Sequence, residues 1–135
     1  MKRILVGALA CIGAAAWLLY QEWPDMKPHL IFCDVGQGDA TLITHGSLQM
    51  LIDGGPDDAV LNCLENHMPF WDRRIEVVVA THPDADHING LVPVLRKYRA
   101  SRILTSSLSK ETGDRSKTVT FFSYFRLTHS TELVF

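Results

Sequence analysis

Seven consecutive residues, Thr81 to His87, carry two histidines and two aspartates directly behind the apolar run Ile75 to Ala80. The nearly continuous apolar run predicts a strand that is covered on both faces. In an extended loop after it, His82, Asp84 and Asp86 would project to one side. A tight turn at the last two residues of the motif would then supply ligands from the opposite side. The chain is therefore constrained to bring a buried strand and a cluster of ionisable side chains to one sheet edge.

This cluster has the composition of a metal site. Neutral imidazole suits zinc, and carboxylates suit harder ions such as manganese. We predict His82, Asp84, Asp86 and His87 as metal ligands. Two ions held about 4 Å apart by such a cluster can share a water and clamp the oxygens of a phosphoryl or acyl group. The alternative is an acidic turn that caps the next helix, but two histidines and two aspartates in this spacing favour metal.

Two glycine-containing segments precede the metal motif. The first runs from Asp34 through Gly36 and Gly38 to Asp39, and the second is Leu51 to Gly55. Glycine permits a positive φ and a close approach of the backbone, so the first turn can bring Asp34 and Asp39 near the metal loop. The isolated G-x-G is too weak to indicate a dinucleotide site, because no G-x-G-x-x-G follows.

Together these segments resemble a known family. Residues 82–87 resemble the H-x-H-x-D-H signature of the metallo-β-lactamase fold, with Asp84 where most members carry the second histidine. The variant H-P-D-A-D-H is similar to the hydrolase domain of ComEC, a DNA-uptake competence protein. Residues 34–40 resemble that family's D-V-G-Q-G-D-A motif, and residues 51–55 its L-I-D-G-G strand end. The resemblance covers roughly residues 29–105.

The resemblance implies an α/β fold, the N-terminal half of a metallo-β-lactamase αββα sandwich. The apolar run near the N-terminus adds one predicted transmembrane helix in front of it. The resemblance also implies a phosphodiesterase or nuclease that acts on DNA with two divalent ions, zinc or manganese. His82 and Asp84 would bind one ion, Asp86 and His87 the other, and Asp86 would orient the hydroxide nucleophile between them. Structural support of the site would come from Asp34, Gly36, Gly38, Asp39, Asp53 and Gly54. In the family, the aspartate at the Asp53 position hydrogen-bonds the metal loop and does not bind metal.

Such a domain also has a second half, which supplies an aspartate in an S-G-D segment and a histidine in an H-H-G-S segment. Neither segment occurs in this sequence, and neither Asp114 nor His129 is assigned as a ligand. We therefore expect residues 29–105 to be a partial domain and residues 106–135 to be an irregular tail. An inactive metal-binding or membrane-tethered interaction domain is the alternative function. A hydrolase of lactams or thioesters shares the fold, but the D-V-G-Q-G-D-A resemblance argues against it.

The N-terminal segment, residues 1–24, is predicted to be a membrane anchor or a signal segment. Lys2 and Arg3 precede an uncharged apolar run over residues 4–20, and aromatic residues flank the end of that run. This length is at the short end of what spans a bilayer. The basic start places the N-terminus in the cytoplasm, and thus the soluble part on the extracytoplasmic side of a bacterial membrane. A cleaved signal peptide shares these features and stays open.

Composition adds few constraints. The net charge of −2 argues against a broad nucleic-acid-binding surface. A local basic cluster is either a solvated helix face or a contact with phosphates; its residues are Arg96, Lys97, Arg99 and Arg102. Cys11, Cys33 and Cys63 form no C-x-x-C pair, so we expect small buried hydrophobes and no disulfide.

Hydrophobic periodicity predicts the remaining elements. Strands are expected over residues 29–35, 40–44, 48–52, 75–80 and 103–105, with helices from Asp57 or Asp58 to Met68 and from Leu91 to Tyr98. His45 is expected to face solvent at a hairpin tip, and His67 to lie near a helix end as a partner of the helix dipole.

Overall fold

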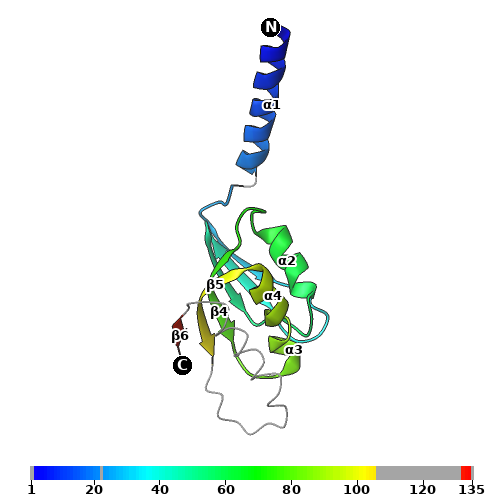
Figure 1. Cartoon of the computed structure of the whole chain (residues 1–135). Coiled ribbons are helices and arrows are strands. Elements are labelled where there is room, and N and C mark those ends of the chain that lie inside the picture. Colours follow the sequence, from blue (N-terminus) through cyan, green and yellow to red (C-terminus); the bar gives the residue numbers. More distant parts are fainter. Residues whose placement is uncertain (1, 22, 106–131, 135) are drawn as a thin grey trace.

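The computed structural model describes residues 2–21, 23–105 and 132–134 (Figure 1). Its elements are α1 (Lys2–Gln21), β1 (Pro28–Phe32), β2 (Thr41–His45), β3 (Leu48–Ile52), α2 (Ala59–His67), β4 (Arg74–Ala80), α3 (Ala85–Ile88), α4 (Leu91–Lys97), β5 (Arg99–Thr105) and β6 (Glu132–Val134). The expected tail over residues 106–135, with Asp114 and His129, lies outside the described residues except for β6.

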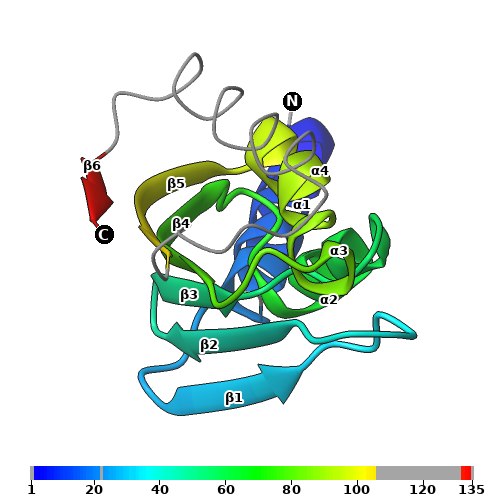
Figure 2. The ribbon, with the colours of Figure 1, turned by 90° about the horizontal axis from the view of Figure 1, so that it is seen from below.

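The strands form one mixed sheet in the order β1-β2-β3-β4-β5-β6. The first three pair antiparallel, as expected for strands joined by short turns, and β3 to β6 pair parallel. Helices α2, α3 and α4 lie on the same side of this sheet (Figure 2). The predicted α/β class is therefore confirmed, with a helix-covered sheet and an apolar helix in front of it.

The core lies between this sheet and its helices. Leu42, Leu51, Val78 and Ile103 occupy consecutive register positions on four neighbouring strands, and all four are fully buried. From the helices, Val60, Leu64, Leu91 and Val94 are equally buried and belong to the same cluster. Burying side chains of this size stabilises a fold by about 1.5–3 kcal/mol each. The apolar residues whose periodicity predicted the two helices thus form the faces that pack on the sheet.

The parallel strands determine where polar side chains gather. Because β3 and β4 are parallel, their carboxyl ends meet at one edge of the sheet, where open α/β sheets bind ligands. Asp53 follows β3 at this edge, and Thr81 follows β4. The same edge lies at the opposite end of the domain from α1 (Figure 1).

Several predicted boundaries need correction. The first strand ends at Phe32 and not at residue 35, and β5 begins at Arg99, well before residue 103. The metal loop is extended only as far as Asp84, after which Ala85–Ile88 forms the helical turn α3. The amides of His87 and Ile88 both donate to the Asp84 carbonyl. Asp86 therefore does not continue the alternation that we expected of an extended loop.

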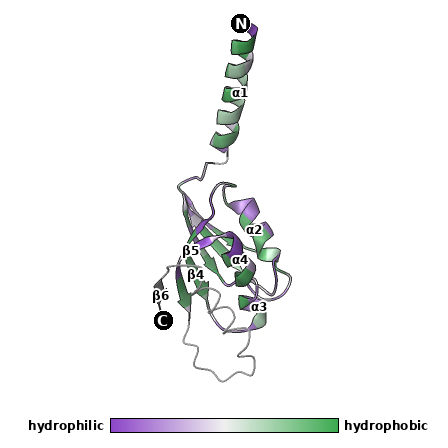
Figure 3. Cartoon of the chain, viewed as in Figure 1, coloured by the Kyte–Doolittle hydropathy of each residue, from purple (hydrophilic) through white to green (hydrophobic). Residues whose placement is uncertain are grey.

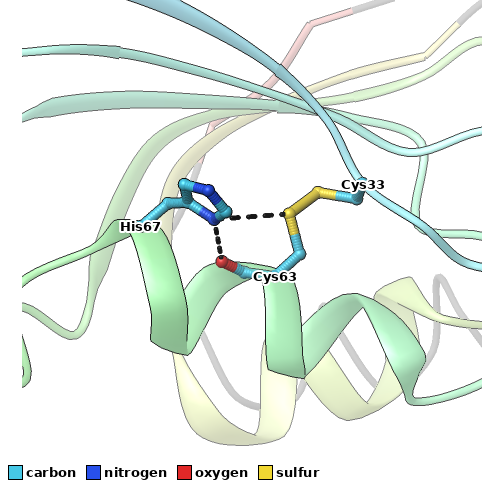
Figure 4. The surroundings of a disulfide bond; sticks show 3 residues. All are labelled: Cys33, Cys63 and His67. Atoms are coloured by element: carbon cyan, nitrogen blue, oxygen red, sulfur yellow. Dashed lines mark hydrogen bonds between the residues drawn. A yellow bond between two sulfur atoms is a disulfide. The ribbon is translucent and has the colours of Figure 1, made fainter.

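The prediction that no disulfide forms was wrong. Cys33 and Cys63 are joined, with their Cα atoms 5.6 Å apart (Figure 4). Cys33 follows β1, and Cys63 lies on α2, so packing of the helix on the sheet brings them together. Their separation of 30 residues carries no local signal for this pairing. In the same turn, His67 donates from Nδ1 to the Cys63 carbonyl at 2.9 Å.

Helix α1 extends away from the domain, and none of its residues is buried (Figure 1). It is apolar along nearly its whole length (Figure 3). By length and composition it can cross a membrane, and a signal sequence near an N-terminus has the same properties. Cys11 is a free, exposed thiol on this helix rather than a buried side chain.

Candidate metal centre

Asp53 is the innermost carboxylate at the carboxyl edge of the sheet. Its backbone N–H donates to the Val79 carbonyl at 2.8 Å, which fixes the end of β3 against β4. Its φ of 56° is in the left-handed region, where only a minority of non-glycine residues are found. The residue is only 3% exposed. A buried carboxylate in this backbone conformation is held by its surroundings and requires hydrogen-bond donors.

Three donors converge on the two Asp53 oxygens. Oδ1 accepts the backbone N–H of Thr81 at 2.9 Å, and Oδ2 accepts the Thr81 hydroxyl at 2.5 Å. Oδ2 also lies 3.1 Å from Nδ1 of His87. A carboxylate has no proton to give, so His87 must carry its proton on Nδ1. The lone pair of His87 is then on Nε2.

The hydroxyl of Thr81 extends this network to His82. Its Oγ1 lies 2.8 Å from Nδ1 of His82. The single hydroxyl proton points to Asp53, so Thr81 can only accept here, and His82 also carries its proton on Nδ1. The two imidazole rings lie side by side with their centroids 3.8 Å apart. Both histidines consequently present an Nε2 lone pair, and a neutral imidazole of this tautomer can bind a metal ion through Nε2.

Each of these lone pairs faces a second carboxylate. Nε2 of His82 is 3.5 Å from Oδ2 of Asp84, and Nε2 of His87 is 3.9 Å from Oδ2 of Asp86. A lone pair that faces a carboxylate needs a positive charge nearby, either a second proton on the ring or a cation. Imidazole nitrogen and carboxylate oxygen are also the donor types that zinc and manganese accept. The residues present therefore fit a metal centre.

Asp84 is not explained by helix capping. It occupies the N-cap position of α3, but its side chain makes no capping hydrogen bond. The alternative that this aspartate is simply a helix cap therefore lacks its defining contact.

Two glycine turns pack closely against the backbone of the metal loop. A Cβ on Gly38 would collide with the backbone carbonyl of Asp86, so only glycine fits there. Gly54 donates its N–H to the His87 carbonyl at 2.7 Å, and a Cβ on it would meet the backbone at Leu91. Both segments that the sequence analysis singled out thus contact the loop at residues 86–91.

The other predicted supporting residues lie further out. Oδ2 of Asp39 is 4.0 Å from Nδ1 of His87. The backbone carbonyl of Asp39 accepts the Gly55 N–H at 3.0 Å. Asp34 is exposed, and its Oδ1 accepts the N–H of Gly36, so its recorded hydrogen bond lies within its own loop. Gly36 has a φ of +77° and open space around its Cα. Asp39 is thus near His87, and the described hydrogen bond of Asp34 is not with the metal loop.

Among the described residues, one group of three ligand atoms lies mutually within 4.8 Å, from Asp53, His82 and His87. This set includes the buried Asp53, which the hydrogen bonds commit to Thr81 and His87. Thr81 was not among the predicted site residues, although it directly precedes His82 and its hydroxyl can both donate and accept.

The comparisons with known proteins agree with this geometry. A family model described as the metallo-beta-lactamase superfamily matches residues 33–124, more than half of the chain. The match includes the glycine turns and the histidine and aspartate loop, and it ends beyond β5. No curated protein matches the chain significantly. Its fold, the paired imidazole and carboxylate groups and this match together show that the chain belongs to the metallo-beta-lactamase superfamily.

Proposed function

We propose that the protein is a metal-dependent phosphodiesterase or nuclease of the ComEC type that acts on DNA. The observation that carries the hydrolase assignment is the orientation of His82 and His87. A single buried carboxylate, Asp53, organises both rings so that each Nε2 faces an acidic side chain. Such preorganised ligand pairs are the arrangement that two-ion hydrolases use.

We assign His82 and Asp84 to one divalent ion and Asp86 and His87 to the other. Asp53 stays an outer partner that orients the rings, because its oxygens already accept three hydrogen bonds. Bound ions would polarise a phosphoryl oxygen and make a nearby water more acidic. The Asp86 side chain is 50% exposed, so its carboxylate can accept a proton of the attacking water and orient it.

The metals proposed are zinc and manganese. A carboxylate at position 84, where an imidazole is usual in the family, makes the site harder and more favourable to manganese. Each ion is assigned one nitrogen ligand and one oxygen ligand. These ligands therefore predict no difference in affinity between the two ion positions.

DNA as the substrate rests on the resemblance of the glycine turns to ComEC. A basic cluster is a second feature, but it lies toward the other end of the sheet, because Arg99 pairs with Arg74 at the start of β4 and the metal loop follows the end of that strand. Arg96 and Lys97 end α4, whereas Arg99 and Arg102 lie on β5, and all four are exposed. Lys97 pairs with Glu65 of α2, so it also has a structural role. Phosphate contacts by exposed arginines would add salt-dependent affinity without sequence preference.

The proposed setting is the outer side of a bacterial membrane, with α1 as a single-pass anchor. This setting is supported by the basic Lys2-Arg3 start and by the length of α1. A disulfide between Cys33 and Cys63 also suits an oxidising compartment.

The test uses the full chain in detergent micelles. The metal-free protein is titrated with zinc or manganese, bound metal is counted by plasma mass spectrometry, and hydrolysis of single- and double-stranded DNA is followed. We expect about two ions per chain and hydrolysis that Asp86→Asn lowers by about 10²–10⁴-fold. The matched control is Asp58→Asn, an exposed aspartate at the start of α2, which should change neither quantity.

Other outcomes would redirect the assignment. Bound metal without hydrolysis of any phosphodiester would favour the alternative, a metal-binding or membrane-tethered interaction domain. Hydrolysis of lactams or thioesters, but not of DNA, would contradict the proposed substrate class. An absence of bound metal would overturn the proposed function as a whole.

A further inference from the structure

We infer that Thr81 is a positioning residue that fixes the tautomer of His82 by relaying the charge of Asp53 to that ring. The inference rests on the proposed metal function for its purpose, but its geometry is independent of any bound ion. The single carboxylate of Asp53 then orients both histidines, His87 directly and His82 through the Thr81 hydroxyl.

The proton count supports this relay. The Thr81 hydroxyl has one proton, and the 2.5 Å contact with Oδ2 of Asp53 uses it, because a carboxylate only accepts. The 2.8 Å contact of Oγ1 with Nδ1 of His82 must then use the proton of the ring. Replacing the hydroxyl by a methyl group would remove the acceptor that holds this proton on Nδ1.

A purely structural role for Thr81 does not explain these contacts. Its backbone N–H already ties the end of β4 to Oδ1 of Asp53 at 2.9 Å. The hydroxyl nevertheless makes two further contacts, one with the Asp53 carboxylate and one with the His82 ring.

The relay also predicts an asymmetry between the histidines. His87 receives its orientation directly from Asp53 at 3.1 Å, and its side chain is 12% exposed. The His82 side chain is 43% exposed, and the described hydrogen bonds connect it to Asp53 through Thr81. Loss of the hydroxyl should therefore release His82 and leave His87 as it is.

The test is nitrogen NMR of histidine-labelled, metal-free full chain in micelles at about pH 8, where an ordinary imidazole is neutral. We compare Thr81→Val, which has nearly the same shape, with Thr81→Ser, which keeps the hydroxyl. His82 should carry its proton on Nδ1 in the wild type and in Thr81→Ser, and should exchange between both tautomers in Thr81→Val. His87 should keep its Nδ1 proton in all three proteins.

Metal affinity is the second readout. Loss of an outer-shell partner typically lowers metal affinity by about 10–100-fold, so we expect this decrease in Thr81→Val and near-normal affinity in Thr81→Ser. An unchanged His82 tautomer in Thr81→Val would overturn the inference. Release of both histidines to the same extent would also overturn it, because that result indicates general loss of structure. If the wild type binds no metal, the proposed function fails while the tautomer result still decides the role of Thr81.

Discussion

Asp53 combines an unfavourable backbone angle with the densest set of hydrogen bonds in the candidate centre. Backbone strain of this kind costs about 1–3 kcal/mol and persists where the surroundings hold it in place. Here the Val79 carbonyl fixes the Asp53 amide, and Thr81 and His87 fix its carboxylate. The strain therefore places a carboxylate where it can orient two rings, a role that the family resemblance implied for this residue.

Replacement of Asp84 by alanine tests the proposed ligand pairs. We expect metal stoichiometry to fall by at least one ion, because Oδ2 of Asp84 is the carboxylate atom that faces Nε2 of His82. Stability should change by less than about 0.5 kcal/mol, since the side chain is exposed and makes no capping hydrogen bond. Plasma mass spectrometry and urea unfolding measure the two quantities.

Asp58→Ala is the matched control for this variant. Asp58 is likewise an exposed N-cap aspartate, of α2, without a side-chain capping bond. The Asp58→Ala substitution should leave the metal content of the protein unchanged. Unchanged stoichiometry in Asp84→Ala as well would remove Asp84 from the ligand set.

Gly38 and Gly36 offer a matched pair in one loop. Both have a positive φ, +71° and +77°, so alanine at either position costs about 1–2 kcal/mol of strain. Only at Gly38 would the new Cβ also displace the Asp86 backbone, because open space surrounds Gly36. We therefore expect Gly38→Ala to lower metal affinity and Gly36→Ala to lower stability alone. Calorimetric titration with zinc checks this; equal metal affinities would show that the turn does not hold Asp86 in place.

At the scale of elements, the sequence predicted most of the strands and turns that position the candidate metal centre. The run Ile75 to Ala80 forms the strand that delivers the motif, and L-I-D-G-G ends the neighbouring parallel strand. The helical turn after Asp84 was not predicted, since four residues contain too few positions to show a helical period. The Cys33–Cys63 pairing was not predicted either, because it depends on how α2 packs on the sheet.

This disulfide joins the start of the first glycine turn to α2, and its removal has a calculable effect. Closing a loop of 30 residues stabilises a fold by about 3–4 kcal/mol through the entropy of the unfolded chain. We expect the Cys33→Ser, Cys63→Ser double variant to lose about this free energy of unfolding, measured in urea without reductant. Cys11→Ser, which removes the exposed free thiol, should leave stability unchanged. A double variant as stable as the wild type would mean that the bond contributes no such constraint.

At the scale of the whole molecule, the candidate centre and α1 lie at opposite ends of the domain (Figure 1). A helix of 20 residues is about 30 Å long, which matches the hydrocarbon thickness of a bilayer. If α1 spans the membrane, the metal centre faces away from the lipid surface. A long polymer such as DNA could then approach the centre without contacting the bilayer.

The redox state of the cysteines reports on which side of the membrane the domain folds. Disulfides persist in oxidising compartments and are rare in the cytosol. Protein taken from bacterial membranes, denatured without reductant and treated with a large maleimide, should therefore react at Cys11 alone. A version that starts at Met26 and stays in the cytosol should react at Cys33 and Cys63, because it lacks α1 and therefore the proposed route to the oxidising side. Reaction at all three cysteines of the full chain would place the domain on the cytoplasmic side, and the orientation inferred from Lys2 and Arg3 would be wrong.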